Sequence, residues 1–95
     1  MTWSRSDMFV EYVIEYIAKE KLKENAVTRE FGDIFKQVAE MVAFRSDEGK
    51  YCKLCGAGPY RSAAQIMMHF RKNHRSCIKA IFRDLKNARK AKKTG

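Results

Sequence analysis

Apolar residues recur at helical spacing through the first part of the chain. The pattern predicts a helix from Ser6 to about Glu24, with Ser4 or Ser6 as the N-cap and Asp7 in the first turn. At about 100° per residue, its apolar side chains cover roughly two-thirds of the circumference, more than a surface helix needs. They are Met8, Phe9, Val10, Tyr12, Val13, Ile14, Tyr16 and Ile17. This helix must be covered from two sides, either by the rest of the chain or by a second copy.

A second amphipathic helix is predicted from Thr28, a favourable N-cap, to about Phe44. Gly32 should cost this helix about 1 kcal/mol relative to alanine. Its apolar residues are Phe31, Ile34, Phe35, Val38, Met41 and Val42. Because a short connection joins the two helices, segment 1–48 should form either an antiparallel helical hairpin or half of a helix-turn-helix.

A third amphipathic pattern begins at Cys77, where Ile78, Ile81, Phe82 and Leu85 form an apolar stripe. A basic face lies about 100° around the same helix. It consists of Lys72, Arg75, Lys79, Arg83, Lys86 and Lys90. Segment 77–95 should therefore be an amphipathic basic helix, disordered from Ala88 onward. The fold class expected from all three patterns is mainly α.

Charge is divided unevenly between the two halves of the chain. Residues 1–50 carry 8 Lys or Arg and 10 Asp or Glu, whereas residues 51–95 carry 12 Lys or Arg and the single Asp84. A segment with almost no acids should bind a polyanion, and double-stranded DNA is the expected partner. RNA is the alternative, although stacking aromatics, which single-strand binders use, are scarce in this half.

Four residues in the second half have the spacing of metal ligands. Cys52 and Cys55 form a C-x2-C pair, and His69 and His74 follow on a predicted helix. Such a set supplies the four ligands of a tetrahedral zinc ion from one contiguous stretch. Zn²⁺ is therefore the expected cofactor, and the segment should unfold without it.

The segment from Cys52 to His74 resembles the two-Cys, two-His zinc finger family. Tyr60, Ile66 and His69 reproduce the family's spacing of aromatic, aliphatic and first histidine. The resemblance implies that segment 49–76 is one ββα finger, with the cysteines on a β-hairpin and the histidines on a helix. The run from Cys55 to Tyr60 is similar to fingers encoded by crenarchaeal viruses and plasmids, which implies a regulator of transcription in an archaeal host cell.

The gap between the two histidines departs from a regular helix. At about 100° per residue, His74 lies roughly 140° around the helix from His69, so both cannot face one metal ion. A local widening or break near Lys72 and Asn73 is therefore expected.

If the finger docks as its family does, the first turns of its helix meet base edges in the major groove. The residues placed to reach bases are Ser62, Gln65 and Met68, and Gln65 could pair with adenine. The remaining candidates are basic and suit phosphates, which position a protein without reading sequence. They are Arg61, Arg71, Lys72, Arg75, Lys79, Arg83 and Lys86.

A single finger covers only about 3 base pairs, so specific binding needs a second reading surface or a second copy. A homodimer through the N-terminal helices would supply the second copy. The alternative is that the surplus apolar face packs on the stripe of segment 77–95. The competing function is a protein-interaction module in which zinc only builds structure.

Neither an enzyme nor a membrane protein is expected. A catalytic zinc keeps an open position, whereas four ligands are available here, and no carboxylate lies nearby in sequence to act as a base. No stretch approaches the roughly 18 uninterrupted apolar residues of a membrane helix, and a signal-peptide pattern is lacking. The expected location is intracellular, in the cytoplasm or nucleoid. Cys77 is expected to pack among apolar residues.

Overall fold

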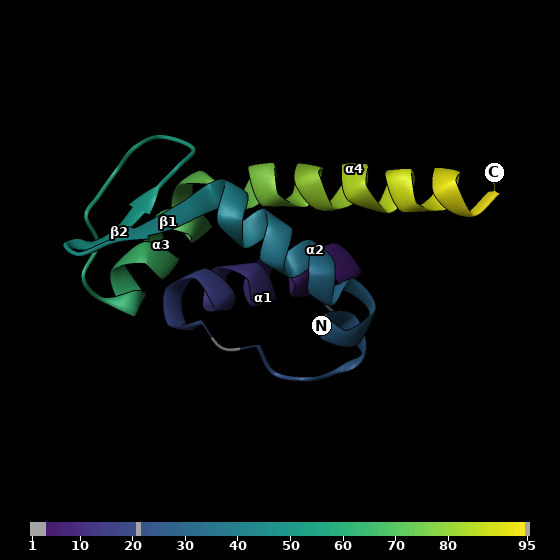
Figure 1. The fold of residues 1–95 in the computed structure, drawn as a ribbon, viewed down its shortest axis with the longest axis horizontal. Coiled ribbons are helices and arrows are strands. Elements are labelled where there is room, and N and C mark those ends of the chain that lie inside the picture. Colours follow the sequence, from purple (N-terminus) through teal and green to yellow (C-terminus); the bar gives the residue numbers. More distant parts are fainter. Residues whose placement is uncertain (1–3, 21, 95) are drawn as a thin grey trace.

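Four helices and one β-hairpin make up the part of the chain that the computed structural model describes, residues 4–20 and 22–94, with side chains as far as residue 88 (Figure 1). The elements in chain order are α1 (Arg5–Lys19), α2 (Ala26–Val42), β1 (Ala43–Ser46), β2 (Gly49–Cys52), α3 (Ala63–Asn73) and α4 (Arg75–Thr94). The prediction of a mainly α fold is confirmed.

Helix α1 begins as predicted but ends earlier than predicted. Ser4 is the N-cap, and its hydroxyl accepts a hydrogen bond from the backbone N–H of Asp7 at 3.2 Å. The helix stops at Lys19, because Glu20 adopts a left-handed conformation (φ 58°). The Nζ of Lys50, on β2, donates hydrogen bonds to the carbonyls of Ile17 and Ala18. The expected extension to Glu24 is wrong, and a contact distant in sequence caps the last turn instead.

Helix α2 begins one turn earlier than predicted. Asn25 is the N-cap, and its side chain accepts from the backbone N–H of Thr28 at 3.1 Å. The hydroxyl of Thr28 accepts in return from the backbone N–H of Asn25 at 2.8 Å, which completes a capping box. Thr28 therefore lies inside the helix rather than at its cap. The helix bends at Phe31, whose φ and ψ of −116° and 21° are not helical.

The β-hairpin begins with residues that the pattern had placed at the end of the second helix. Phe44, the expected end of the second helix, lies in β1 and pairs with Tyr51 of β2, and the two rings stack at 5.1 Å. On the other edge of β2, Lys50 and Tyr60 exchange backbone hydrogen bonds of 3.1 and 2.8 Å. Gly49 is required beside this bridge, because a Cβ there would lie 2.8 Å from the Tyr60 carbonyl oxygen. The hairpin thus starts before the predicted finger and leads into its cysteines.

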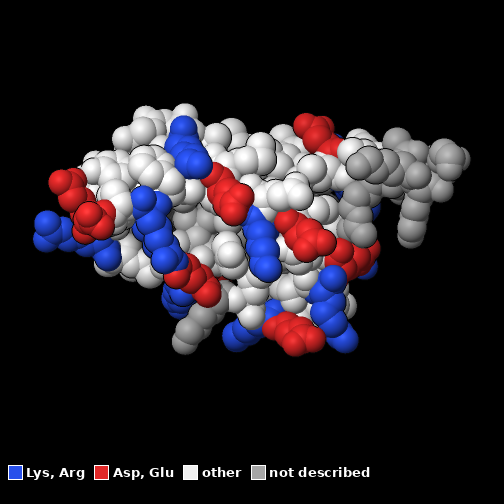
Figure 2. Space-filling model, viewed as in Figure 1, with Lys and Arg blue, Asp and Glu red and all other residues white. Residues whose placement is uncertain are grey.

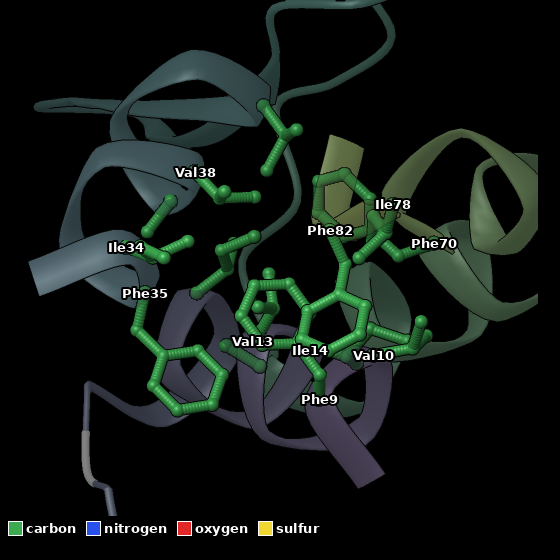
Figure 3. Close-up of a cluster of buried hydrophobic side chains, with 14 of the residues drawn as sticks. Phe9, Val10, Val13, Ile14, Ile34, Phe35, Val38, Phe70, Ile78 and Phe82 are labelled. Atoms are coloured by element: carbon green, nitrogen blue, oxygen red, sulfur yellow. The ribbon is translucent and has the colours of Figure 1, made fainter. Parts of the chain in front are cut away.

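One apolar cluster joins all four helices (Figure 3). Phe9 of α1 lies at its centre, with ring centroids 4.7 Å from Phe35 of α2 and 4.5 Å from Phe82 of α4. Phe70 of α3 and Ile78 of α4 are also fully buried in this cluster. The wide apolar face of α1 is therefore covered within the chain, and its width no longer argues for a second copy. The homodimer stays a prediction without that support.

Helix α4 continues to Thr94, past Ala88, where disorder was expected to begin; Gly95 lies outside the described residues. Its last turns project beyond the other elements (Figure 1). None of the helices that the structure describes is both long and apolar enough to cross a membrane.

Candidate metal centre

The four predicted ligands come together from three elements. Cys52 is the last residue of β2, Cys55 follows in the next turn, His69 lies on α3, and His74 stands between α3 and α4. Their ligand atoms all lie within 4.8 Å of one another. The Nε2 of His74 is 3.2 Å from the Sγ of Cys52, and the Nε2 of His69 is 3.3 Å from the Sγ of Cys55. The cluster can hold a metal ion.

The spacing of these atoms fits a tetrahedron around one ion. Metal–sulfur bonds of about 2.3 Å and metal–nitrogen bonds of about 2.0 Å place neighbouring ligands roughly 3.3–3.8 Å apart. The two sulfur–nitrogen distances lie close to that range, and the two histidine Nε2 atoms are 3.1 Å apart. With all four ligand atoms within 4.8 Å of one another, two sulfurs and two nitrogens lie close enough together to bind a single ion.

The cysteines lie on a tight turn held by its own backbone. The N–H of Gly56 donates to the carbonyl of Cys52 at 2.7 Å, and the N–H of Cys52 donates to the carbonyl of Ala57 at 2.9 Å. Gly56 has a φ of 75°, which favours glycine at this position. Burial raises the pKa of the Cys52 thiol, and the backbone N–H groups of Cys55 and Leu54 lower it by less. A metal cation bound at the site would favour the thiolate form of Cys52.

His74 occupies a break between two helices. Its φ of −127° and ψ of 10° end α3, and α4 starts at the next residue. The expected break is confirmed, and it falls at the ligand itself rather than near Lys72 and Asn73. Burial, followed by the charge of His69, lowers the pKa of His74. The imidazole is therefore held neutral, the form that binds a metal.

Aromatic and amide groups surround His69. The Tyr60 ring lies 5.2 Å from the His69 ring, and Phe70 lies 5.7 Å from it on the other side. The amide nitrogen of Asn73 lies 3.3 Å from His69 Nδ1 and donates to the His69 carbonyl at 3.2 Å. Ile66 is fully buried in the main cluster, and Tyr60 packs against the same cluster.

The candidate DNA-binding residues fall in three places, of which the second and third share Lys79. The exposed face of α3 and the turn before it carry Arg61, Ser62, Gln65, Met68 and Lys72. Arg71 of α3 and Arg75 and Lys79 of α4 are engaged in a contact with α1. Arg83 and Lys86 line a hollow at the start of α1, with Ser4, Arg5, Ser6, Lys79 and Phe82. The structure therefore does not bring the predicted residues together on one surface.

The second of these places is an ion-pair ladder, formed by Asp7, Glu11, Arg71, Arg75 and Lys79. Glu11 accepts from Arg71 at 3.0 Å and from Arg75 at 2.9 Å. Asp7 pairs with Lys79 at 2.6 Å and with Arg75 at 3.7 Å. The Lys79 ammonium, helped by the Ser4 hydroxyl, lowers the pKa of Asp7 to about 2. Desolvation alone would raise the pKa of Glu11, but the two arginines outweigh it and the pKa is lowered.

Sequence reasoning missed the two acids of this ladder. Asp7 and Glu11 are four residues apart on α1, and the cations at 71, 75 and 79 repeat the same spacing. Matching spacings of opposite charge on two helices could have suggested the contact. On the face shown in Figure 2, acidic and basic side chains are likewise interspersed, and neither sign forms a continuous patch.

Cys77 was expected to pack among apolar residues, but it is exposed on α4.

Comparison of the chain with protein-family models, curated proteins and solved structures found no significant match. What the site can do must therefore be argued from its own residues and geometry.

Proposed function

We propose that this chain is a zinc-dependent protein that binds double-stranded DNA and acts as a small transcriptional regulator. The observation that carries the proposal is the outer face of α3. This helix bears one ligand of the metal cluster and ends at another. Together with the turn before it, its outer face exposes basic and neutral side chains only: Arg61, Ser62, Ala64, Gln65, Met68, Lys72 and Asn73.

Zinc is the metal proposed for the cluster. Two thiolates and two imidazoles in a tetrahedron suit Zn²⁺, whereas magnesium and calcium prefer oxygen ligands in larger coordination shells. With all four positions taken by protein, the ion would serve structure rather than catalysis. It would fix His69 and His74 relative to the cysteine turn, and so fix α3 relative to the hairpin.

The exposed face of α3 supplies both kinds of DNA contact. Gln65 and Met68 lie at its middle and suit base edges: the amide can pair with adenine, and the thioether side chain offers only apolar contact to a thymine methyl. Arg61 and Lys72 lie at its two ends and suit phosphates. Arg71, by contrast, is held by Glu11, so we assign it to structure rather than to DNA.

The first test is selection of the zinc-loaded protein against a random duplex library at physiological salt, with the metal-free protein as control. An enriched motif supports the regulator, and a palindromic motif also supports a homodimer. Retention without enrichment would reduce the proposal to nonspecific DNA binding. No retention would refute it.

A matched pair of charge reversals locates the interface. Lys72→Glu should weaken binding to all duplexes and lower the salt slope by about 1, because each phosphate contact contributes roughly 0.9 to that slope. Lys36→Glu makes the same change on the exposed side of α2 and should have a smaller effect. Equal effects of the two variants would mean that only net charge matters.

The competing function, a protein-interaction module, rests on exposed apolar residues around the hairpin. Met41, Phe44 and Leu54 are 56%, 42% and 43% exposed. A groove beside them is lined by residues of α1, α2 and the hairpin: Tyr16, Ile17, Glu20, Ala39, Glu40, Ala43, Phe44, Arg45, Lys50 and Lys53. If Phe44→Asp abolished the regulatory effect of the protein and left its DNA binding intact, the result would favour this alternative.

A further inference from the structure

The angle between α3 and α4 decides whether the two histidines can share one ion. His69 lies on α3, and His74 lies at the point where α3 ends and α4 begins. Their Nε2 atoms are 3.1 Å apart only because the chain breaks there. Backbone hydrogen bonds from His74 to Phe70 and from Ile78 to His74 continue on both sides of the break. These local bonds do not by themselves determine the direction in which α4 leaves.

Helix α1 contacts both sides of the break. Its apolar residues meet Phe70 before the break and Ile78 after it, in the same buried cluster (Figure 3). Apolar packing of this kind is not directional, so it leaves the sliding and rotation of the helices weakly determined. Directional contacts are needed to fix the register.

The ion-pair ladder provides these directional contacts. Arg71 lies before the break, and Arg75 and Lys79 lie after it. Glu11 bonds to one cation on each side, with its two carboxylate oxygens shared between Arg71 and Arg75. Asp7 extends the ladder one turn further along α4 through Lys79. Glu11 is the central member, since it ties α3 and α4 to one point on α1.

We propose that Glu11, supported by Asp7, is a positioning residue for the metal centre. It holds α3 and α4 at the angle at which His69 and His74 face the same ion, and so it governs how tightly the metal is kept. The proposal rests on the metal binding proposed above. It makes the metal centre a product of the whole chain, because acids outside the cysteine–histidine segment set its geometry.

The predicted effect lies in metal retention. Groups that orient metal ligands from outside the coordination shell typically change metal affinity by about 10- to 100-fold when removed. Glu11→Gln keeps the shape of the side chain and removes its charge. We expect it to release zinc about 10-fold faster than wild type, with Asp7→Asn intermediate between the two.

The experiment follows zinc transfer from the full-length, zinc-loaded protein to a coloured chelator, and the visible spectrum of the Co²⁺ form. Glu30→Gln is the matched control, because Glu30 pairs with Arg5 at 2.8 Å between α1 and α2, away from the metal. Val38→Ala is the stability control, because Val38 is fully buried in the same cluster. If Glu11 positions the ligands, Glu11→Gln alone releases zinc faster and alters the Co²⁺ spectrum.

The outcomes separate this inference from the function on which it rests. Wild-type protein that binds neither Zn²⁺ nor Co²⁺ would overturn both. Tight binding by wild type together with equal release from Glu11→Gln and Glu30→Gln would overturn the positioning role only.

Discussion

Truncation of Phe82 tests whether α4 is an integral part of the fold. The ring is 5% exposed, and its centroid lies 4.5 Å from that of Phe9 and 5.3 Å from that of Phe31. Phe82→Ala removes both aromatic contacts, worth about 0.5–1.5 kcal/mol each beyond area burial, and leaves a cavity. Buried Phe→Ala changes usually cost about 3–5 kcal/mol in total. For a domain of this size, that predicts a melting temperature lower by roughly 12–40 °C.

The assay is thermal unfolding with excess zinc, followed by circular dichroism and calorimetry. Phe44→Ala is the matched control, because Phe44 is 42% exposed and its ring contacts are with Tyr51 and the Lys53 ammonium of the hairpin region, away from α4. It should cost about 1 kcal/mol. Equal losses in the two variants would refute the reasoning, since they would mean that α4 does not pack on α1 and α2. The ladder, which depends on that packing, would then lose its basis as well.

Four further predictions concern the metal and DNA. His74→Ala should remove tight zinc binding, measured by metal stoichiometry, and lower the melting temperature of the whole chain, because Cys52 belongs to the shared core. The pKa of Cys52 is raised, so near neutral pH metal uptake must displace the proton of this thiol. The pKa of His74 is lowered, so its imidazole has no proton to lose when the metal binds. Zinc affinity in chelator competition should therefore rise at least about tenfold per pH unit above pH 7. The lowered pKa of His74 also means that the metal-free protein should lose stability as the pH falls below about 6.5, measured by urea unfolding. At saturating zinc, Glu11→Gln should tighten binding to any duplex and steepen its salt dependence in anisotropy titrations, because Arg71 loses its carboxylate partner.

The parts of the fold that depend on local spacing could be predicted from the sequence. The ligand set and the break between the histidines follow from residue separations along one segment, and both are present. The Ser4 cap and the helical patterns are local in the same sense. The helix ends were less predictable: α1 stops where Lys50 reaches its carbonyls, and Phe44 leaves the helix to pair with Tyr51. The Lys50 contact joins residues far apart in sequence, and the Phe44–Tyr51 pair depends on a hairpin that the helical pattern did not reveal.

The candidate DNA surface could be predicted only in part. A count of charges along the chain assumes that the acidic and basic halves do not contact each other. In the structure, Asp7 and Glu11 form ion pairs with three of the cations predicted to bind DNA. The residues predicted to bind DNA on the exposed face of α3 are not engaged by these acids, so that part of the prediction still stands as a prediction. Which cations are used internally is a property of tertiary packing, and no composition count reveals it.

The contact between Phe9 and Phe82 has a consequence for synthesis of the protein in the cell. At roughly 5–20 residues per second, the ribosome needs several seconds between these two positions. During that interval the apolar face of α1 can be covered by α2 and then by α3, but not yet by α4. Final burial of that face must wait for the start of α4, which follows the cysteines and histidines in the chain, so the core can close only after all four candidate metal ligands have been synthesised.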